Sequence, residues 1–113
     1  MIVFAHLKFS PDCALAVAET FGRIAPVPDF MKIIGPFIRS NIEEGILTVS
    51  IYECDDAHVD EAMAYLKARY AAFEAIAGVT TSVEEWLGVG VALKLLEETN
   101  SVTDALDLVN FRF

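Results

Sequence analysis

The stretch GILTVSIYECDDAHVDEAMAYLKARYAAF, from Gly45 to Phe73, decides the fold because its hydrophobic period changes halfway along. Side chains alternate between Ile46 and Glu53, and a period of two predicts a β-strand. After Asp55-Asp56, which would cap a helix, apolar residues recur at helical spacing from Val59 to Ala77. The stretch therefore predicts a strand that leads directly into an amphipathic helix.

The segment before this stretch has the same order of elements. Residues Ile2 to Phe9 alternate with apolar side chains on both faces, which predicts a buried strand. Ser10-Pro11 would cap and start a helix, and Gly22 would end it after about residue 21. Residues 30–40 predict an edge strand with a kink or bulge at Gly35-Pro36.

The segment after Gly78 predicts a fourth strand over residues 79–87 and a third helix over about 89–98. A short helix with an apolar end is expected in residues 99–113. The order strand, helix, strand, strand, helix, strand predicts an α+β fold of the ferredoxin-like kind, an antiparallel sheet with helices on one face. We expect a single domain over residues 1–113, with a core at about 1–98 and a helical tail at 99–113.

The chain is more apolar than a lone domain of its size needs to be. Hydrophobic residues make up 55% of the 113 residues, against roughly 45–50% in soluble domains. No run approaches the ~20 apolar residues that span a bilayer. We therefore expect the uncovered sheet face to be buried against a second copy, giving a homodimer joined through the sheet faces. The side chains expected on that face include Phe4, Ile46, Tyr52 and Trp86.

Charge excludes several classes of partner. The net charge of −9 repels phosphate backbones and anionic lipid, so neither nucleic acid nor a membrane is expected as a partner. The apolar start of the chain lacks the basic region of a signal peptide, so a cytoplasmic protein is expected. Cys54 and His58 lack a metal-ligand spacing and Gly88-Val89-Gly90 lacks a complete phosphate-binding motif, so neither a metal nor a cofactor is expected.

The chain resembles the dimeric α/β-barrel superfamily over roughly its first 98 residues. The resemblance lies in the strand at Ile2 to Phe9, the stretch from Lys32 to Pro36, the strand from Gly45 to Glu53 running into Asp55-Asp56, and Gly78 leading to Trp86-Leu87-Gly88. It implies two sheets packed face to face around a cavity. The superfamily includes cofactor-independent oxygenases, muconolactone-isomerase-like enzymes and amino-acid-sensing regulators, and no motif here selects one branch.

The candidate site lies on the sheet face away from the helices, where strand alternation places His6. Strand order would put side chains of the neighbouring strands beside it, so the predicted ligand-binding set is Phe4, His6, Ser50, Tyr52, Glu84 and Trp86. Apolar walls with a few polar groups suit a small-molecule pocket, and an imidazole titrates near neutral pH. The alternative is that His6 hydrogen-bonds across the dimer interface and that Tyr52 and Trp86 are interface core.

Three functions follow as hypotheses. The first is a homodimeric carrier or sensor of a small, largely apolar ligand. The second is a cofactor-independent oxygenase or isomerase with His6 as the catalytic general base and Tyr52 or Ser50 orienting the substrate. The third is an interaction or assembly protein that acts through its apolar tail, Val102 to Phe113. Lys67 and Arg69 are expected on an exposed helix flank, paired with carboxylates.

Overall fold

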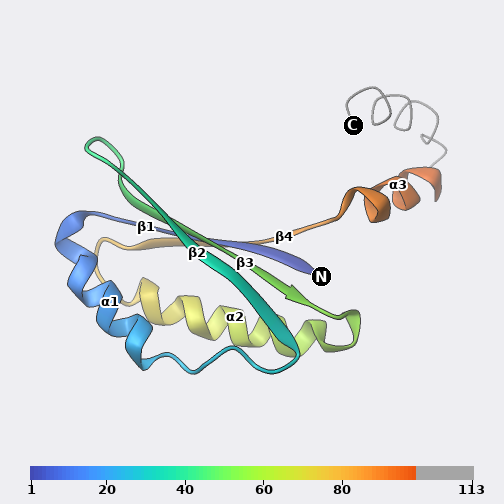
Figure 1. Ribbon diagram of the computed structural model, residues 1–113, viewed down its shortest axis with the longest axis horizontal. Helices are drawn as coiled ribbons and strands as arrows, with labels where there is room; N and C mark the ends of the chain where they lie inside the picture. Colours follow the sequence, from blue (N-terminus) through green and yellow to red (C-terminus); the bar gives the residue numbers. More distant parts are fainter. Residues whose placement is uncertain (99–113) are drawn as a thin grey trace.

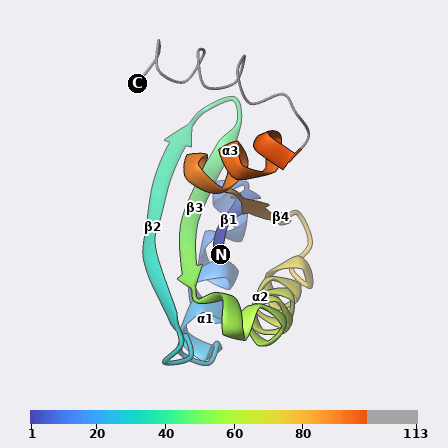
Figure 2. The ribbon, with the colours of Figure 1, turned by 90° about the vertical axis from the view of Figure 1, so that its right-hand side faces the viewer.

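The four strands form one antiparallel sheet. A computed structural model describes residues 1–98, and the predicted tail lies outside the described residues. Figure 1 shows the four strands, and their order β2-β3-β1-β4 can be followed in Figure 2. The strands are β1 (Ile2–Phe9), β2 (Met31–Asn41), β3 (Gly45–Cys54) and β4 (Thr80–Trp86). The structure confirms the predicted α+β class and the antiparallel sheet.

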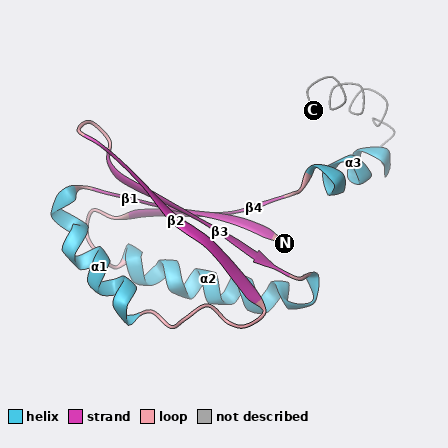
Figure 3. Ribbon diagram, viewed as in Figure 1, coloured by secondary structure: helices cyan, strands magenta, loops and turns pink. Residues whose placement is uncertain are grey.

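Two helices cover one face of this sheet. The first, α1 (Ala14–Arg23), follows the 3-10 turn η1 (Pro11–Cys13), and the second, α2 (Val59–Glu74), follows η2 (Asp56–His58). Both lie on the same side of the strands (Figures 1 and 2). Figure 3 shows the remaining helix, α3 (Val89–Glu98), beyond the end of β4.

The core lies between the sheet and the two helices. Alternate residues of β1 and a stripe of α2 are almost completely buried: Val3, Ala5, Leu7, Ala62, Leu66, Tyr70 and Phe73. The ring of Phe21 on α1 meets that of Phe73, with centroids 4.6 Å apart. Full burial of each large apolar side chain stabilises the fold by roughly 1.5–3 kcal/mol.

The helix ends differ from the prediction. α1 continues through Gly22 to Arg23, because Gly22 does not adopt the left-handed conformation that would end a helix there. Ser10 precedes η1 and its side chain makes no capping hydrogen bond. α2 ends at Glu74, and Gly78, with φ +89°, lies in the turn that leads to β4.

The irregularity predicted in the edge strand is present. β2 lies at the edge of the sheet, and its pairing with β3 shifts between Ile34 and Phe37. Gly35 has φ +103°, a backbone conformation that favours glycine. β2 is hydrogen-bonded to β3 on one side only. The interruption therefore disturbs the hydrogen bonds of one strand pair, whereas in a central strand it would disturb two.

The orientation of β3 contradicts one part of the sequence prediction. Tyr52 is paired with Val3 and Ser50 with Ala5, and directly opposed residues of an antiparallel pair point to the same face. Ser50 and Tyr52 therefore point toward the helices, and so does Ile46, which is paired with Phe9. A shift of one residue in strand phase reverses every side chain, so all three were assigned to the wrong face.

The sheet face away from α1 and α2 is called the open face below. His6 lies on it, as predicted, because its neighbours Ala5 and Leu7 belong to the core. Pairing places the following residues on it: Ile2, Phe4, His6 and Lys8 of β1; Lys32, Ile34, Phe37 and Arg39 of β2; Leu47, Val49, Ile51 and Glu53 of β3; Ser82, Glu84 and Trp86 of β4.

α3 lies beyond the end of β4, away from α1 and α2, as Figure 1 shows. Apolar side chains in and before it are about half exposed: Leu87, Val89, Val91 and Leu95. Within residues 1–98, no helix combines the length and the apolar character needed to cross a membrane.

Candidate functional site

His6 lies near the middle of the open face, between β3 and β4. It is paired with Val49 on one side and Ser82 on the other. Its Nδ1 lies 3.3 Å from the Ser82 hydroxyl oxygen, so this hydroxyl can fix the orientation of the ring. Ser82 was not among the predicted site residues, although it lies two residues before Glu84 and therefore on the same face.

A shallow hollow adjoins His6 on the β2 side. Its volume is about 190 Å³, and it is lined by His6, Phe37, Ile38, Arg39, Leu47 and Val49. The Phe37 side chain is 54% exposed, and the Arg39 guanidinium reaches Glu44 at 3.8 Å. The sequence did not identify the β2 residues, because the bulge before Phe37 changes which residues of β2 share a face with His6.

An aromatic pair lies further along the open face. The rings of Phe4 and Trp86 have centroids 5.1 Å apart and are tilted by 44°, and Glu84 is paired with Phe4. Trp86 is 53% exposed. The structure therefore brings Phe4, His6, Glu84 and Trp86 to one face, as predicted.

Ser50 and Tyr52 are absent from this group. The Tyr52 hydroxyl lies 2.8 Å from the Tyr70 hydroxyl in the core, and Ser50 is buried on the same side of the sheet. Burial, followed by the hydrogen bond with Tyr52, raises the pKa of Tyr70 above its usual range. Ser50 and Tyr52 therefore lie on the helix side of the sheet and cannot orient a substrate beside His6.

His58 lies at the start of α2 and is paired with an acidic neighbour. Its Nδ1 is 2.7 Å from a carboxylate oxygen of Asp55, and its ring stacks on Phe30 with centroids 4.6 Å apart. The hydrogen bond to Asp55 raises the pKa of His58 and lowers that of Asp55. In the part of the chain that the structure describes, no three His, Cys, Asp or Glu side chains are grouped as a metal site.

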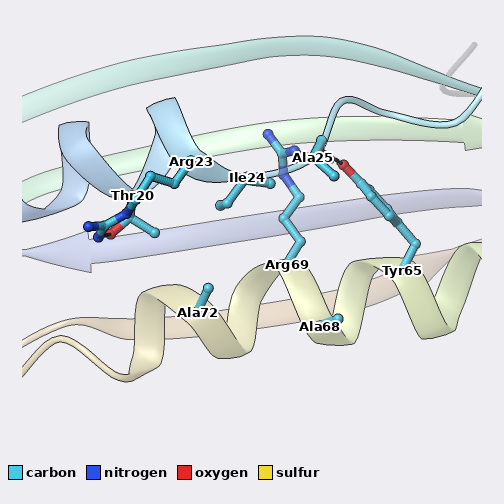
Figure 4. A pocket seen from close by; sticks show the side chains of 8 residues that line it. All are labelled: Thr20, Arg23, Ile24, Ala25, Tyr65, Ala68, Arg69 and Ala72. Atoms are coloured by element: carbon cyan, nitrogen blue, oxygen red, sulfur yellow. Dashed lines mark hydrogen bonds between the residues drawn. The ribbon is translucent and has the colours of Figure 1, made fainter.

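A larger hollow lies on the helix side, between α1 and α2. Its volume is about 380 Å³ and its lining includes Thr20, Arg23, Ile24, Tyr65, Ala68 and Arg69, as Figure 4 shows. Arg69 was expected on an exposed flank beside carboxylates. It is instead partly buried in this hollow, where its Nη1 donates to the Tyr65 hydroxyl at 2.9 Å. We call this hollow the interhelical pocket.

No protein-family model and no curated protein sequence matches the chain. A search of solved structures finds a similarity to a tripeptidase from Staphylococcus aureus subsp. aureus Mu50, with a TM-score of 0.43 and 11% sequence identity. The match covers 88% of this chain and 35% of the tripeptidase chain.

Proposed function

We propose that the chain is a ferredoxin-like domain that forms a homodimer through its open face and holds a small, largely apolar molecule between the two sheets, beside His6. Support for the fold assignment comes from the element order together with the strand order β2-β3-β1-β4. The observation that carries the proposal is the apolar character of the open face, where Phe37 and Trp86 are each more than half exposed. Large exposed apolar surfaces mark binding sites in folded proteins.

Charge favours a second copy as the occupant of this face. The chain carries a net charge of −9, so two copies repel one another over most of their surface. The open face differs, because its charged side chains are of both signs: Lys8, Lys32 and Arg39 beside Glu53 and Glu84. A near-balanced, mainly apolar face is where two acidic chains can meet without this repulsion.

The hollow beside His6 is the proposed ligand site. It is shallow in one copy, with mainly apolar walls and one imidazole, and a second sheet would close it from above. Enclosure of a mainly apolar surface with a few polar groups is typical of small-molecule sites. The oxygenase or isomerase alternative keeps His6 as general base, with Ser82 in the orienting position, since Tyr52 and Ser50 face the core.

Native mass spectrometry with a panel of neutral apolar molecules tests the ligand site. We expect adducts at the mass of the dimer, and we expect Val49→Trp to abolish them because the larger ring fills the hollow. Leu15→Trp is the matched control, since Leu15 is 72% exposed on α1. Adducts at the monomer mass, or adducts that persist in Val49→Trp, would contradict the proposal.

A further inference from the structure

We propose that the interhelical pocket binds a small molecule that carries a carboxylate on an apolar body. The pocket lies on the helix side of the sheet, away from the open face. This inference is therefore independent of the dimer and of the ligand beside His6. It rests on the charge of the lining, on the fixed guanidinium of Arg69 and on the apolar walls.

The lining is cationic in a chain that is strongly acidic. Arg23 and Arg69 both contribute to it, and no Asp or Glu does. Arg23 bonds to the Thr20 hydroxyl at 3.5 Å and Arg69 to the Tyr65 hydroxyl at 2.9 Å. Within residues 1–98, the ion pairs of the structure involve neither guanidinium. Two cationic groups whose protein partners are neutral favour an anionic ligand.

Arg69 also has an unused donor. Its Nε is buried and has no hydrogen-bond partner among residues 1–98, whereas nearly all buried polar groups in proteins are paired. Its guanidinium carbon lies 6.0 Å from the ring centroids of both Phe21 and Tyr52. These rings and the Tyr65 hydroxyl, which itself donates to the Ala25 carbonyl at 2.7 Å, hold the guanidinium in place. A guanidinium fixed in this way is organised in advance for a carboxylate.

The rest of the lining is apolar and built from small side chains. Ile24 and Ala25 lie on one side, and Ala68 and Ala72 lie on α2, as Figure 4 shows. The two alanines leave space between the helices, and the volume of about 380 Å³ is within the usual range of roughly 300–1,000 Å³ for small-molecule sites. Apolar walls suit a carboxylic acid with a hydrocarbon body better than a strongly hydrated phosphate dianion.

Isothermal titration calorimetry with octanoate on the full chain tests this site. We expect octanoate to bind at least about tenfold more tightly than octanol, which has the same chain without the charge, and more tightly than inorganic phosphate. Arg69→Met should weaken octanoate binding at least about tenfold, and Arg23→Gln should also weaken it. Lys67→Met removes the same charge from an exposed position of α2 outside the pocket, and it should leave the affinity unchanged.

A second variant keeps the test decisive if Arg69→Met fails to fold. Ala68→Leu retains both arginines and fills the space between the helices, so it should abolish octanoate binding. Sedimentation should show that this variant has the same oligomeric state as the wild type. An unchanged oligomeric state means that the loss of octanoate binding arises in the interhelical pocket and not at the open face. Equal affinity for octanoate and octanol, tighter binding of phosphate, or wild-type affinity in Ala68→Leu would each overturn the inference.

Discussion

At the scale of single residues, a buried pair of hydroxyl groups favours the observed orientation of β3. The Tyr52 and Tyr70 hydroxyls hydrogen-bond to each other in the core, Ser50 is buried on the same side of β3, and Tyr52 is only 1% exposed. Turning β3 over would place the Tyr52 hydroxyl on the open face and deprive Tyr70 of its partner. Because an unpaired buried hydroxyl costs about 1–3 kcal/mol, the hydrogen bond between Tyr52 and Tyr70 favours the observed phase of the strand.

A double-mutant cycle measures the coupling energy of the hydrogen bond between Tyr52 and Tyr70. We expect Tyr52→Phe and Tyr70→Phe each to lower the free energy of unfolding by about 1 kcal/mol, because each leaves a buried hydroxyl with one partner fewer. The double variant should lose clearly less than the sum, since it removes both ends of the bond. Urea denaturation at one fixed protein concentration gives the three values. Strictly additive losses would show that the two hydroxyls are not coupled.

At the scale of elements, close turns fix how the strands connect. Gly45 starts β3 with φ +83°, and a Cβ added there would lie 2.7 Å from the carbonyl oxygen of Phe9. Both the backbone conformation and the close approach require glycine at this position. Gly22, within α1, has no such neighbour within 4 Å and no positive φ.

The same substitution should therefore have opposite effects at these two glycines. Gly45→Ala should lower the free energy of unfolding by about 2 kcal/mol through backbone strain and the clash with Phe9. Gly22→Ala should raise it by about 0.5–1 kcal/mol, because alanine has less freedom to lose in a helix. Thermal or urea denaturation of both variants provides the comparison. Equal effects at the two sites would contradict the turn geometry described here.

The order of elements and the irregularity near Gly35 could be predicted from the sequence, because periodicity, proline and glycine report on local backbone structure. The phase of β3 could not, because both of its alternating sets contain large apolar or aromatic side chains and only the pairing with β1 decides between them. The interhelical pocket could not be predicted from the sequence for a related reason. Its walls come from α1 and α2 together, and the signal available in the sequence was the pair of small residues Ala68 and Ala72 next to Arg69.

At the scale of the whole molecule, residues 1–98 cover the sheet with helices α1 and α2 on one face. α1 and α2 lie on the core side (Figure 2). Strand pairing places Phe4, Phe37 and Trp86 on the open face. The helix α3 adds further exposed apolar side chains beyond β4, including Val89 and Val91. Such an arrangement leaves much of the apolar content of this chain available to a partner, and the mixed charges of the open face favour a second copy.

Analytical ultracentrifugation at micromolar concentration tests the dimer most directly. We expect the wild-type protein to sediment at twice the chain mass of 12.4 kDa. Trp86→Asp should shift it to a monomer or unfold it, because the new carboxylate would be buried without a partner at the interface. Leu15→Asp, the same kind of change at an exposed position of α1, should leave the dimer intact. A folded wild-type monomer at this concentration would contradict the account.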